Sequence, residues 1–250
     1  SIIGMTLDAD GAPFVTGSTS SSDFETAPAP ARWSSGRVPY DRTYNGGNTD
    51  GFLIKFFPDG TLSKRDDGTF STYFGGKGED EGRGVWVDAL GRAVLVGNTT
   101  STDLPTVGTI FPAKIGGQDI FMAVFTDDGR ALTSCTYYGG LGTDDVRGVR
   151  KDPTGNIGFM FGSTNSTDFP TVGAGATVDR RGGSDGFIAA VNTSTNKFCT
   201  LVAGSEVDTV TAIAVDDLGD VYISLSSKST DLYAGDTAWH NAPQGDNDGY

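Results

Sequence analysis

Three aspartates at a constant spacing are the residues of this sequence that could bind a metal ion. Asp80, Asp144 and Asp208 lie 64 residues apart each time, and each follows a glycine-rich stretch. Hard cations such as Ca²⁺ take several carboxylate and carbonyl oxygens as ligands, so these aspartates would form a cation site if the fold gathered them into one ring. The structural alternative is that each aspartate accepts hydrogen bonds from backbone amides of its own turn.

A second candidate is a long stretch, residues 25–49, that could contact a protein partner or a glycan. It contains Trp33, Arg37, Tyr40 and Tyr44. Aromatic residues interleaved with arginine are typical of recognition surfaces, and aromatic rings also suit stacking on sugars. The alternative is that these aromatic side chains pack on the strands of their own part of the chain.

Three sequons add candidate modification sites. Asn98, Asn165 and Asn192 each begin an Asn-x-Ser/Thr triplet, which is an acceptor for N-linked glycans in secreted proteins. Catalytic residues are not expected. His240 is the only histidine, which argues against histidine-based zinc sites and against most acyl-transfer mechanisms. The only cofactor considered is Ca²⁺ at the repeated aspartates.

The charge of the chain excludes two classes of partner. Lys and Arg number 18 and Asp and Glu number 32, which gives a net charge of −14. Nucleic acids and anionic membrane surfaces require clustered basic residues, so neither is an expected partner. No run approaches the ~18 apolar residues that a membrane-spanning helix needs. The sequence also contains 37 glycines, about twice the usual share, which indicates a turn-rich repeat.

The elements that must position these residues follow from a repeat of about 64 residues. Four landmarks recur in a fixed order. The first is an Asp-x-x-Gly step, found at Asp8–Gly11, Asp88–Gly91, Asp152–Gly155 and Asp216–Gly219. The other three are a Ser/Thr-rich step such as GNTTSTDLP (Gly97–Pro105), a Gly-Gly step such as RGGSDGF (Arg181–Phe187) and a Tyr-Gly-Gly step such as TYYGGLGTDDV (Thr136–Val146).

Each unit contains four short β-type runs bounded by Gly-rich and Asp-rich turns. In the second unit these runs are Gly84–Asp88, Ala93–Gly97, Ile120–Thr126 and Leu132–Tyr138. No segment has a sustained helical period. Four antiparallel strands per unit, repeated in tandem, predict an all-β protein built as a β-propeller, with a β-solenoid as the rival. One domain would then contain units at about 1–80, 81–145, 146–209 and an incomplete 210–250.

The repeat also resembles a known family. The pattern TYYGG-x-G-x-D, V-x-V-D-x-x-G, G-x-T-x-S-x-D-F-P and GG-x-D-x-F is similar to that of bacterial surface proteins with the seven-bladed β-propeller repeat. The resemblance covers nearly the whole chain and implies a propeller fold and a secreted or cell-surface location. It implies no active site. The fourth unit departs from the pattern, since Leu225 replaces the glycine of G-x-T.

The strand count predicts about 3.5 blades, and therefore an arc of a longer propeller or a subunit that a neighbouring chain completes. Open strand edges would then pair with other chains. The two cysteines, Cys135 and Cys199, occupy the same position in adjacent units and are expected to be free, half-buried thiols.

Two functions follow from these features. The leading hypothesis is a non-enzymatic extracellular propeller that acts in adhesion, as a scaffold or in a filament. The alternative is a carbohydrate-binding or carbohydrate-active propeller, since paired carboxylates can do acid and base chemistry. The sialidase-type S-x-D-x-G-x-T-W motif is absent from the sequence.

Overall fold

The structure, a computed structural model, describes residues 1–27, 38–62, 68–108, 111–173, 181–193, 195–232 and 248–249. In these residues it contains fifteen β-strands and no helix. The strands form four antiparallel sheets, and in each sheet the spatial order of the strands is their order in the chain. The prediction of an all-β repeat is therefore confirmed.

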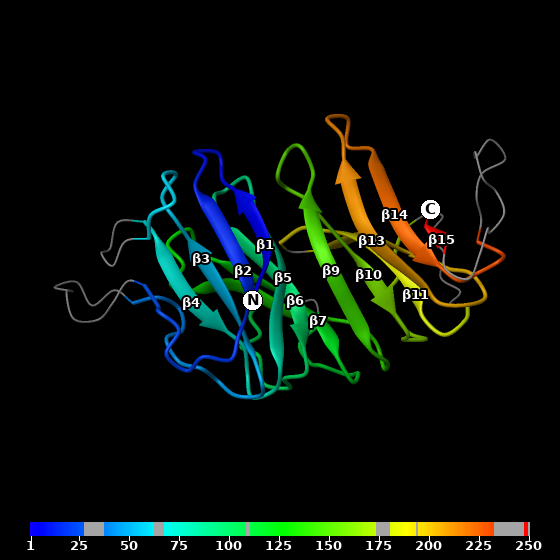
Figure 1. The fold of residues 1–250 in the computed structure, drawn as a ribbon, viewed down its shortest axis with the longest axis horizontal. Coiled ribbons are helices and arrows are strands. Elements are labelled where there is room, and N and C mark those ends of the chain that lie inside the picture. The colour runs from blue at the N-terminus through cyan, green and yellow to red at the C-terminus, as the bar shows by residue number, and fades with distance from the viewer. Residues whose placement is uncertain are drawn as a thin grey trace.

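The four sheets follow one another across the molecule in chain order (Figure 1). Sheet 1 contains β1 (Ile2–Leu7), β2 (Pro13–Thr19), β3 (Asp50–Lys55) and β4 (Phe70–Phe74). Sheet 2 contains β5 (Asp80–Val87), β6 (Ala93–Thr99), β7 (Asp119–Phe125) and β8 (Leu132–Tyr138). Sheet 3 contains β9 (Asp144–Lys151), β10 (Gly158–Thr164), β11 (Asp185–Val191) and β12 (Asn196–Val202). Sheet 4 contains β13 (Asp208–Val215), β14 (Val221–Ser227) and β15 (Asp248–Gly249).

All four predicted strands of the second unit are present: β8 has the predicted bounds, β7 is displaced by one residue, β6 ends two residues later, and the largest difference is at the start of β5. This strand begins four residues before the predicted Gly84, at Asp80, because a register shift between Gly82 and Gly84 lets the chain continue pairing with β6. Such a bulge adds an unpaired residue and bends the strand. In sheet 4, Asp248 and Gly249 form a short third strand that pairs with β14.

The Asp-x-x-Gly landmark forms the turn between the first and second strands of every sheet. In sheet 2, Asp88 accepts hydrogen bonds from the backbone N–H groups of Leu90 and Arg92, both at 2.9 Å. Gly91 has φ +78°, a left-handed conformation that favours glycine. The equivalent glycines Gly11, Gly155 and Gly219 also have positive φ, which explains why both residues of the landmark recur.

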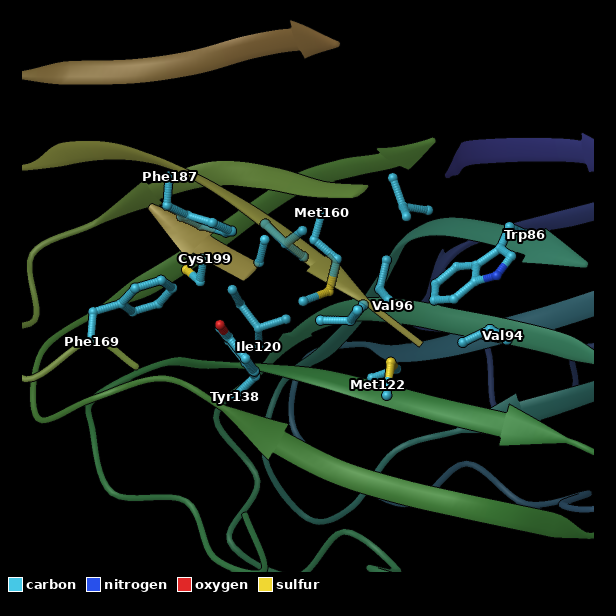
Figure 2. Close-up of a cluster of buried hydrophobic side chains, with 14 of the residues drawn as sticks. Trp86, Val94, Val96, Ile120, Met122, Tyr138, Met160, Phe169, Phe187 and Cys199 are labelled. Carbon is cyan, nitrogen blue, oxygen red and sulfur yellow. The ribbon is translucent and has the colours of Figure 1, made fainter. Parts of the chain in front are cut away.

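Apolar side chains fill the spaces between the sheets. Every residue of β6 and of β7 is buried, because sheet 2 packs against sheet 1 on one face and against sheet 3 on the other. Figure 2 shows the cluster between sheets 2 and 3, where Trp86, Ile120 and Met122 meet Met160 and Phe187. Strands buried on both faces carry continuous apolar runs, and β7 (DIFMAVF) is an example.

The first strands of successive sheets lie next to one another. β1 contacts β5, β5 contacts β9, and β9 contacts β13. The backbones approach closely at glycine: a methyl group added to Gly4 would lie 3.0 Å from the Cα atom of Gly84. Because the first strands are neighbours, the aspartates that begin β5, β9 and β13 occupy equivalent positions in sheets 2, 3 and 4.

Both cysteines are free, as predicted, but they are fully buried rather than half-buried. The reason is that the chain between the second and third strands returns to the outer edge of the fourth strand. Val107 pairs with Cys135, and Val172 pairs with Cys199. Burial raises the pKa of both thiols to about 12, so neither is a reactive thiolate.

Candidate functional site

The repeated aspartates open the first strands of sheets 2, 3 and 4, where all three are buried. In sheet 2, Asp80 accepts hydrogen bonds from the backbone N–H of Gly76 (2.8 Å) and from the hydroxyl of Ser101 (2.7 Å). The hydroxyl oxygen of Ser101 also accepts from the backbone N–H of Gly78 at 2.8 Å. The carboxylate and the hydroxyl together hold the glycine-rich turn that leads into β5.

A second aspartate completes this arrangement. Asp103, two residues after Ser101, accepts a hydrogen bond from the backbone N–H of Lys77 at 2.9 Å. That bond holds the pKa of Asp103 below its usual range. A methyl group on Gly76 would lie 2.4 Å from the Asp103 carboxylate, so glycine is required where the turn meets this loop.

The same contacts recur in sheets 3 and 4. We call them the entry-loop network, which consists of Asp80, Ser101 and Asp103 in sheet 2, Asp144, Ser166 and Asp168 in sheet 3, and Asp208, Ser229 and Asp231 in sheet 4. The equivalent bonds to the first aspartate come from Gly140 (2.8 Å) and Ser166 (2.9 Å) in sheet 3 and from Gly204 (2.7 Å) and Ser229 (2.9 Å) in sheet 4. Those to the second come from Leu141 (2.8 Å) and Ser205 (2.7 Å).

The structure does not bring Asp80, Asp144 and Asp208 together as a metal site. Each belongs to a different sheet, and its Oδ2 atom accepts hydrogen bonds from its own turn and from the serine of the adjoining loop. Within the described ranges, no group of three or more His, Cys, Asp or Glu side chains is placed to hold a metal ion. The contacts are those of the structural alternative, because the donors to each carboxylate are a backbone amide and a serine hydroxyl.

A second set of buried aspartates was not selected from the sequence. Asp50, Asp119 and Asp185 begin the third strands and are buried. Each accepts a hydrogen bond from a backbone N–H of the preceding loop, donated by Asn45 (2.6 Å), Ile115 (3.0 Å) and Arg181 (3.0 Å) respectively. The signal was present in the Gly-Gly step, where the aspartate follows the glycine pair after two residues in the first unit and after one residue in the second and third units.

The two sets meet in pairs at the junctions between sheets. A methyl group on Gly75 would lie 2.8 Å from an Asp80 oxygen and 3.0 Å from an Asp50 oxygen, so both carboxylates flank this glycine. Burial and the charge of Asp80 raise the pKa of Asp50 to about 6, against the hydrogen bond from Asn45. Burial also raises the pKa of Asp80. Both carboxyl groups of this junction therefore take up a proton at a higher pH than an ordinary aspartate does.

The predicted contact residues of the 25–49 stretch divide into two groups. Trp33 and Arg37 lie outside the described residues. Tyr40 packs between sheets, with its ring 5.6 Å from that of Phe125, and burial raises its pKa to about 12. The Tyr44 hydroxyl donates to the carbonyl of Gly47 at 3.1 Å. Both tyrosines thus make the packing contacts of the structural alternative.

The three candidate glycan acceptors lie in different environments. Asn98 is buried, and its amide bonds across to sheet 3: the side-chain nitrogen donates to Asp145, and the oxygen accepts from the backbone N–H of Val146 at 2.9 Å. The prediction is wrong for Asn98, because a glycan there would break this contact and has no room. Asn165 is exposed and Asn192 is half-buried.

Two polar cavities lie near the first strands. One, of about 270 Å³, lies along the bulges of these strands and is lined by Arg83, Arg147 and Arg150. Arg83 is paired with Glu81 (2.6 Å) and Arg147 with Asp145 (3.0 Å). The other, of about 280 Å³, is lined by carboxylate, amide and hydroxyl side chains: Asn48, Thr49, Glu79, Glu81, Asn98 and Gln118.

The comparisons with known proteins give no family. No model of a known protein family matches the chain, and no curated protein matches it. Within the part of the chain that the structure describes, no helix is long and apolar enough to cross a membrane.

Proposed function

We propose that this chain is a non-enzymatic structural or adhesion module of the β-propeller type, secreted or displayed at a cell surface. One observation carries the proposal. The side chains that could do chemistry, the repeated Asp, Ser and Asp, form the same entry-loop network in three sheets. An active site usually departs from the repeat, whereas a structural network is expected to follow it.

The arrangement of the sheets supports the propeller architecture. Successive sheets pack face to face, and their first strands are neighbours, as the strands around a central channel would be. The repeat also resembles the bacterial surface propeller repeat. About 3.5 blades would be present in this chain. An experimental structure in which the four sheets do not share an axis would exclude a propeller.

The location is tested on intact cells of the source organism. A secreted or surface module must be reached by an antibody raised against the chain, and external protease must remove the signal without breaking the cells. A matched cytoplasmic protein serves as the control for leakage. Labelling that appears only after permeabilisation would exclude a surface location.

A carbohydrate-binding function is the second candidate, and the cavity that contains Glu79 and Asn48 favours it. Carboxylates and amides are hydrogen-bonding partners for sugar hydroxyls, and this cavity also contains Gln118. A glycan array with the wild-type chain and a Glu79→Gln variant tests it. Binding that Glu79→Gln weakens would favour the lectin, and release of reducing sugar from a bound glycan would contradict a non-enzymatic role.

A further inference from the structure

A β-bulge interrupts the first strand of every sheet and turns one extra residue toward a common cavity. The register to the second strand shifts across this residue, which leaves it unpaired. The four bulge residues are Ile3 in β1, Arg83 in β5, Arg147 in β9 and Thr211 in β13. All four line the cavity of about 270 Å³, which we call the arginine cavity. Bulges frequently re-aim a side chain next to a functional site.

The bulge residue changes from sheet to sheet, unlike the residues of the entry-loop network. It is arginine in sheets 2 and 3 but isoleucine or threonine in the other two. A third arginine, Arg150, lines the same cavity, and its equivalents Thr6, Trp86 and Ala214 are uncharged. Three basic side chains are thus gathered on two adjacent strands, β5 and β9, in the middle of the row of sheets (Figure 1). A structural role common to all sheets does not explain them.

The arginine cavity retains hydrogen-bond donors for a ligand. Arg83 pairs with Glu81 through Nη2 at 2.6 Å, but its buried Nε has no hydrogen-bond partner among the described residues. Arg150 donates from Nη1 to the carbonyl of Val149 at 3.0 Å, and in the described part of the chain it has no carboxylate partner. A guanidinium presents five N–H donors in a planar fork that matches a carboxylate. These donors suit an oxyanion.

A second cavity adjoins the first and offers partners for hydroxyl groups. Glu81 lines the cavity of about 280 Å³, which we call the amide cavity, and its ion pair with Arg83 joins the two cavities. Asp145 also bridges them, since it accepts from the side-chain amide of Asn98 and pairs with Arg147 at 3.0 Å. Carboxylates and amides are hydrogen-bonding partners for sugar hydroxyls. Each cavity is smaller than the ~300 Å³ at which sites for drug-sized ligands begin, so a small ligand fits best.

We propose that the two cavities together bind a sugar acid, with its carboxylate in the arginine cavity and its hydroxyl groups in the amide cavity. A sugar-acid site presupposes the carbohydrate-binding function proposed above and names the class of sugar. A single carboxylate is favoured over a polyanion, because the net charge of −14 repels an extended run of negative charge. The arginines that carry the site belong to sheets 2 and 3, each of which has a neighbouring sheet on both sides.

Titration calorimetry of the wild-type chain with glucuronate, glucose and acetate tests the proposed ligand class. Glucose lacks the carboxylate, and acetate lacks the hydroxyl groups. Titration to about 10 mM detects complexes with a dissociation constant on the order of 1 mM. Glucuronate should bind about tenfold more tightly than either control, because each control loses one set of hydrogen bonds. Equal affinity for glucuronate and one of the controls would overturn the inference, as would no binding of glucuronate.

Single substitutions test the arginine cavity. Arg150→Gln removes a charge without breaking an ion pair of the described residues, and should weaken glucuronate binding about tenfold. Arg83→Gln should weaken it too, with far-UV circular dichroism as the control for folding because Glu81 loses its partner. Lys197→Gln is the matched control: it removes an exposed charge on β12, at the opposite edge of sheet 3, and should bind as wild type does. Unchanged binding by Arg150→Gln would overturn the inference.

The outcomes distinguish the sugar-acid site from the functions proposed above. Glycan binding that Glu79→Gln weakens, together with equal affinity for glucose and glucuronate, would overturn the sugar-acid site and retain carbohydrate binding. No binding of glucuronate or of any glycan on the array would overturn both. Neither result would bear on surface display, which the antibody experiment measures independently.

Discussion

The junction between sheets 1 and 2 and the junction between sheets 2 and 3 have the same geometry but different charges. Asp50 and Asp80 flank Gly75 in the first, and Asp119 and Asp144 flank Gly139 in the second. In the second junction, the charge of Lys114 lowers the pKa of Asp119 against the larger effect of burial, which raises it. At Asp50, burial and the charges of Asp80 and Asp41 raise the pKa, and the effects that lower it are backbone hydrogen bonds from Asn45 and Gly46 rather than a basic side chain.

The difference shows which properties the repeat determines and which depend on individual residues. Both junctions keep the aspartates, the glycine and the backbone donors, so the positions of the carboxyl groups are common to them. The loop before Asp50 is one residue longer between its glycines and the aspartate than the loop before Asp119, and Asn45 and Lys114 occupy the loop starts. The pKa values of Asp50 and Asp119 therefore depend on different neighbours, although the carboxyl groups occupy equivalent positions in the two junctions.

The largest effect is expected from removing the aspartate of the entry-loop network. Asp144→Ala leaves the N–H of Gly140 and the hydroxyls of Ser166 and Thr164 without their acceptor. We expect a loss of about 3 kcal/mol in the free energy of unfolding, since each buried group left unpaired costs about 1–3 kcal/mol. Asp80→Ala removes the two bonds to Gly76 and Ser101 and should cost less. Urea denaturation measures both; equal stability of Asp144→Ala and wild type would contradict the network.

A smaller and opposite effect is expected at Asp50. Its pKa of about 6 means that the folded state holds the ionised carboxylate less favourably than the unfolded state does at pH 7.5. Asp50→Asn removes that charge and keeps an oxygen that can accept from Asn45. We expect stabilisation by about 1 kcal/mol, below the 1.4 kcal/mol that each pKa unit can provide. Asp119→Asn is the matched variant and should gain less, because Lys114 already offsets the charge.

The pH dependence of stability gives a third test of the same comparison. A raised folded pKa means that the folded state binds more protons than the unfolded state between the unfolded value of 3.8 and the folded value of about 6. The contribution of Asp50 to stability is therefore present below pH 4 and is lost as the pH rises to about 6. The difference between wild type and Asp50→Asn should change over this window. A difference that is constant from pH 4 to pH 7 would show that Asp50 titrates normally.

Much of the fold could be predicted from the sequence because the repeat displays the same strand and turn residues several times. β8 has the predicted bounds, and the Asp-x-x-Gly turns are where they were placed. The bulge at Gly82 could not be predicted, since it depends on how β5 lies across the preceding sheet. The full burial of Cys135 was missed for a similar reason: a segment distant in sequence, at Val107, covers the fourth strand.

The residues of the candidate site could be predicted from the sequence, but their structural role could not. Spacing identified Asp80 and its equivalents, but only the contacts to Ser101 and Gly76 distinguish a hydrogen-bonded turn from a cation site. Asn98 shows the same limit, because a sequon states nothing about the bond that its side chain makes to Val146 in the next sheet. The sequence identifies possible hydrogen-bond donors and acceptors, but the tertiary structure determines which of them pair.

The smallest expected effect is that of removing calcium. If Asp80 and its equivalents held Ca²⁺, excess cation at 100 times its dissociation constant would stabilise the fold by about 2.7 kcal/mol, and chelation would lower the melting temperature. The network contacts predict no change in melting temperature between EDTA and millimolar Ca²⁺, because amide and hydroxyl donors already satisfy the Asp80 oxygen that faces Gly76 and Ser101. Mg²⁺ at the same concentration controls for ionic strength. A rise that Ca²⁺ alone produces, and that Asp80→Asn abolishes, would restore the cation site and separate this junction from a purely hydrogen-bonded one.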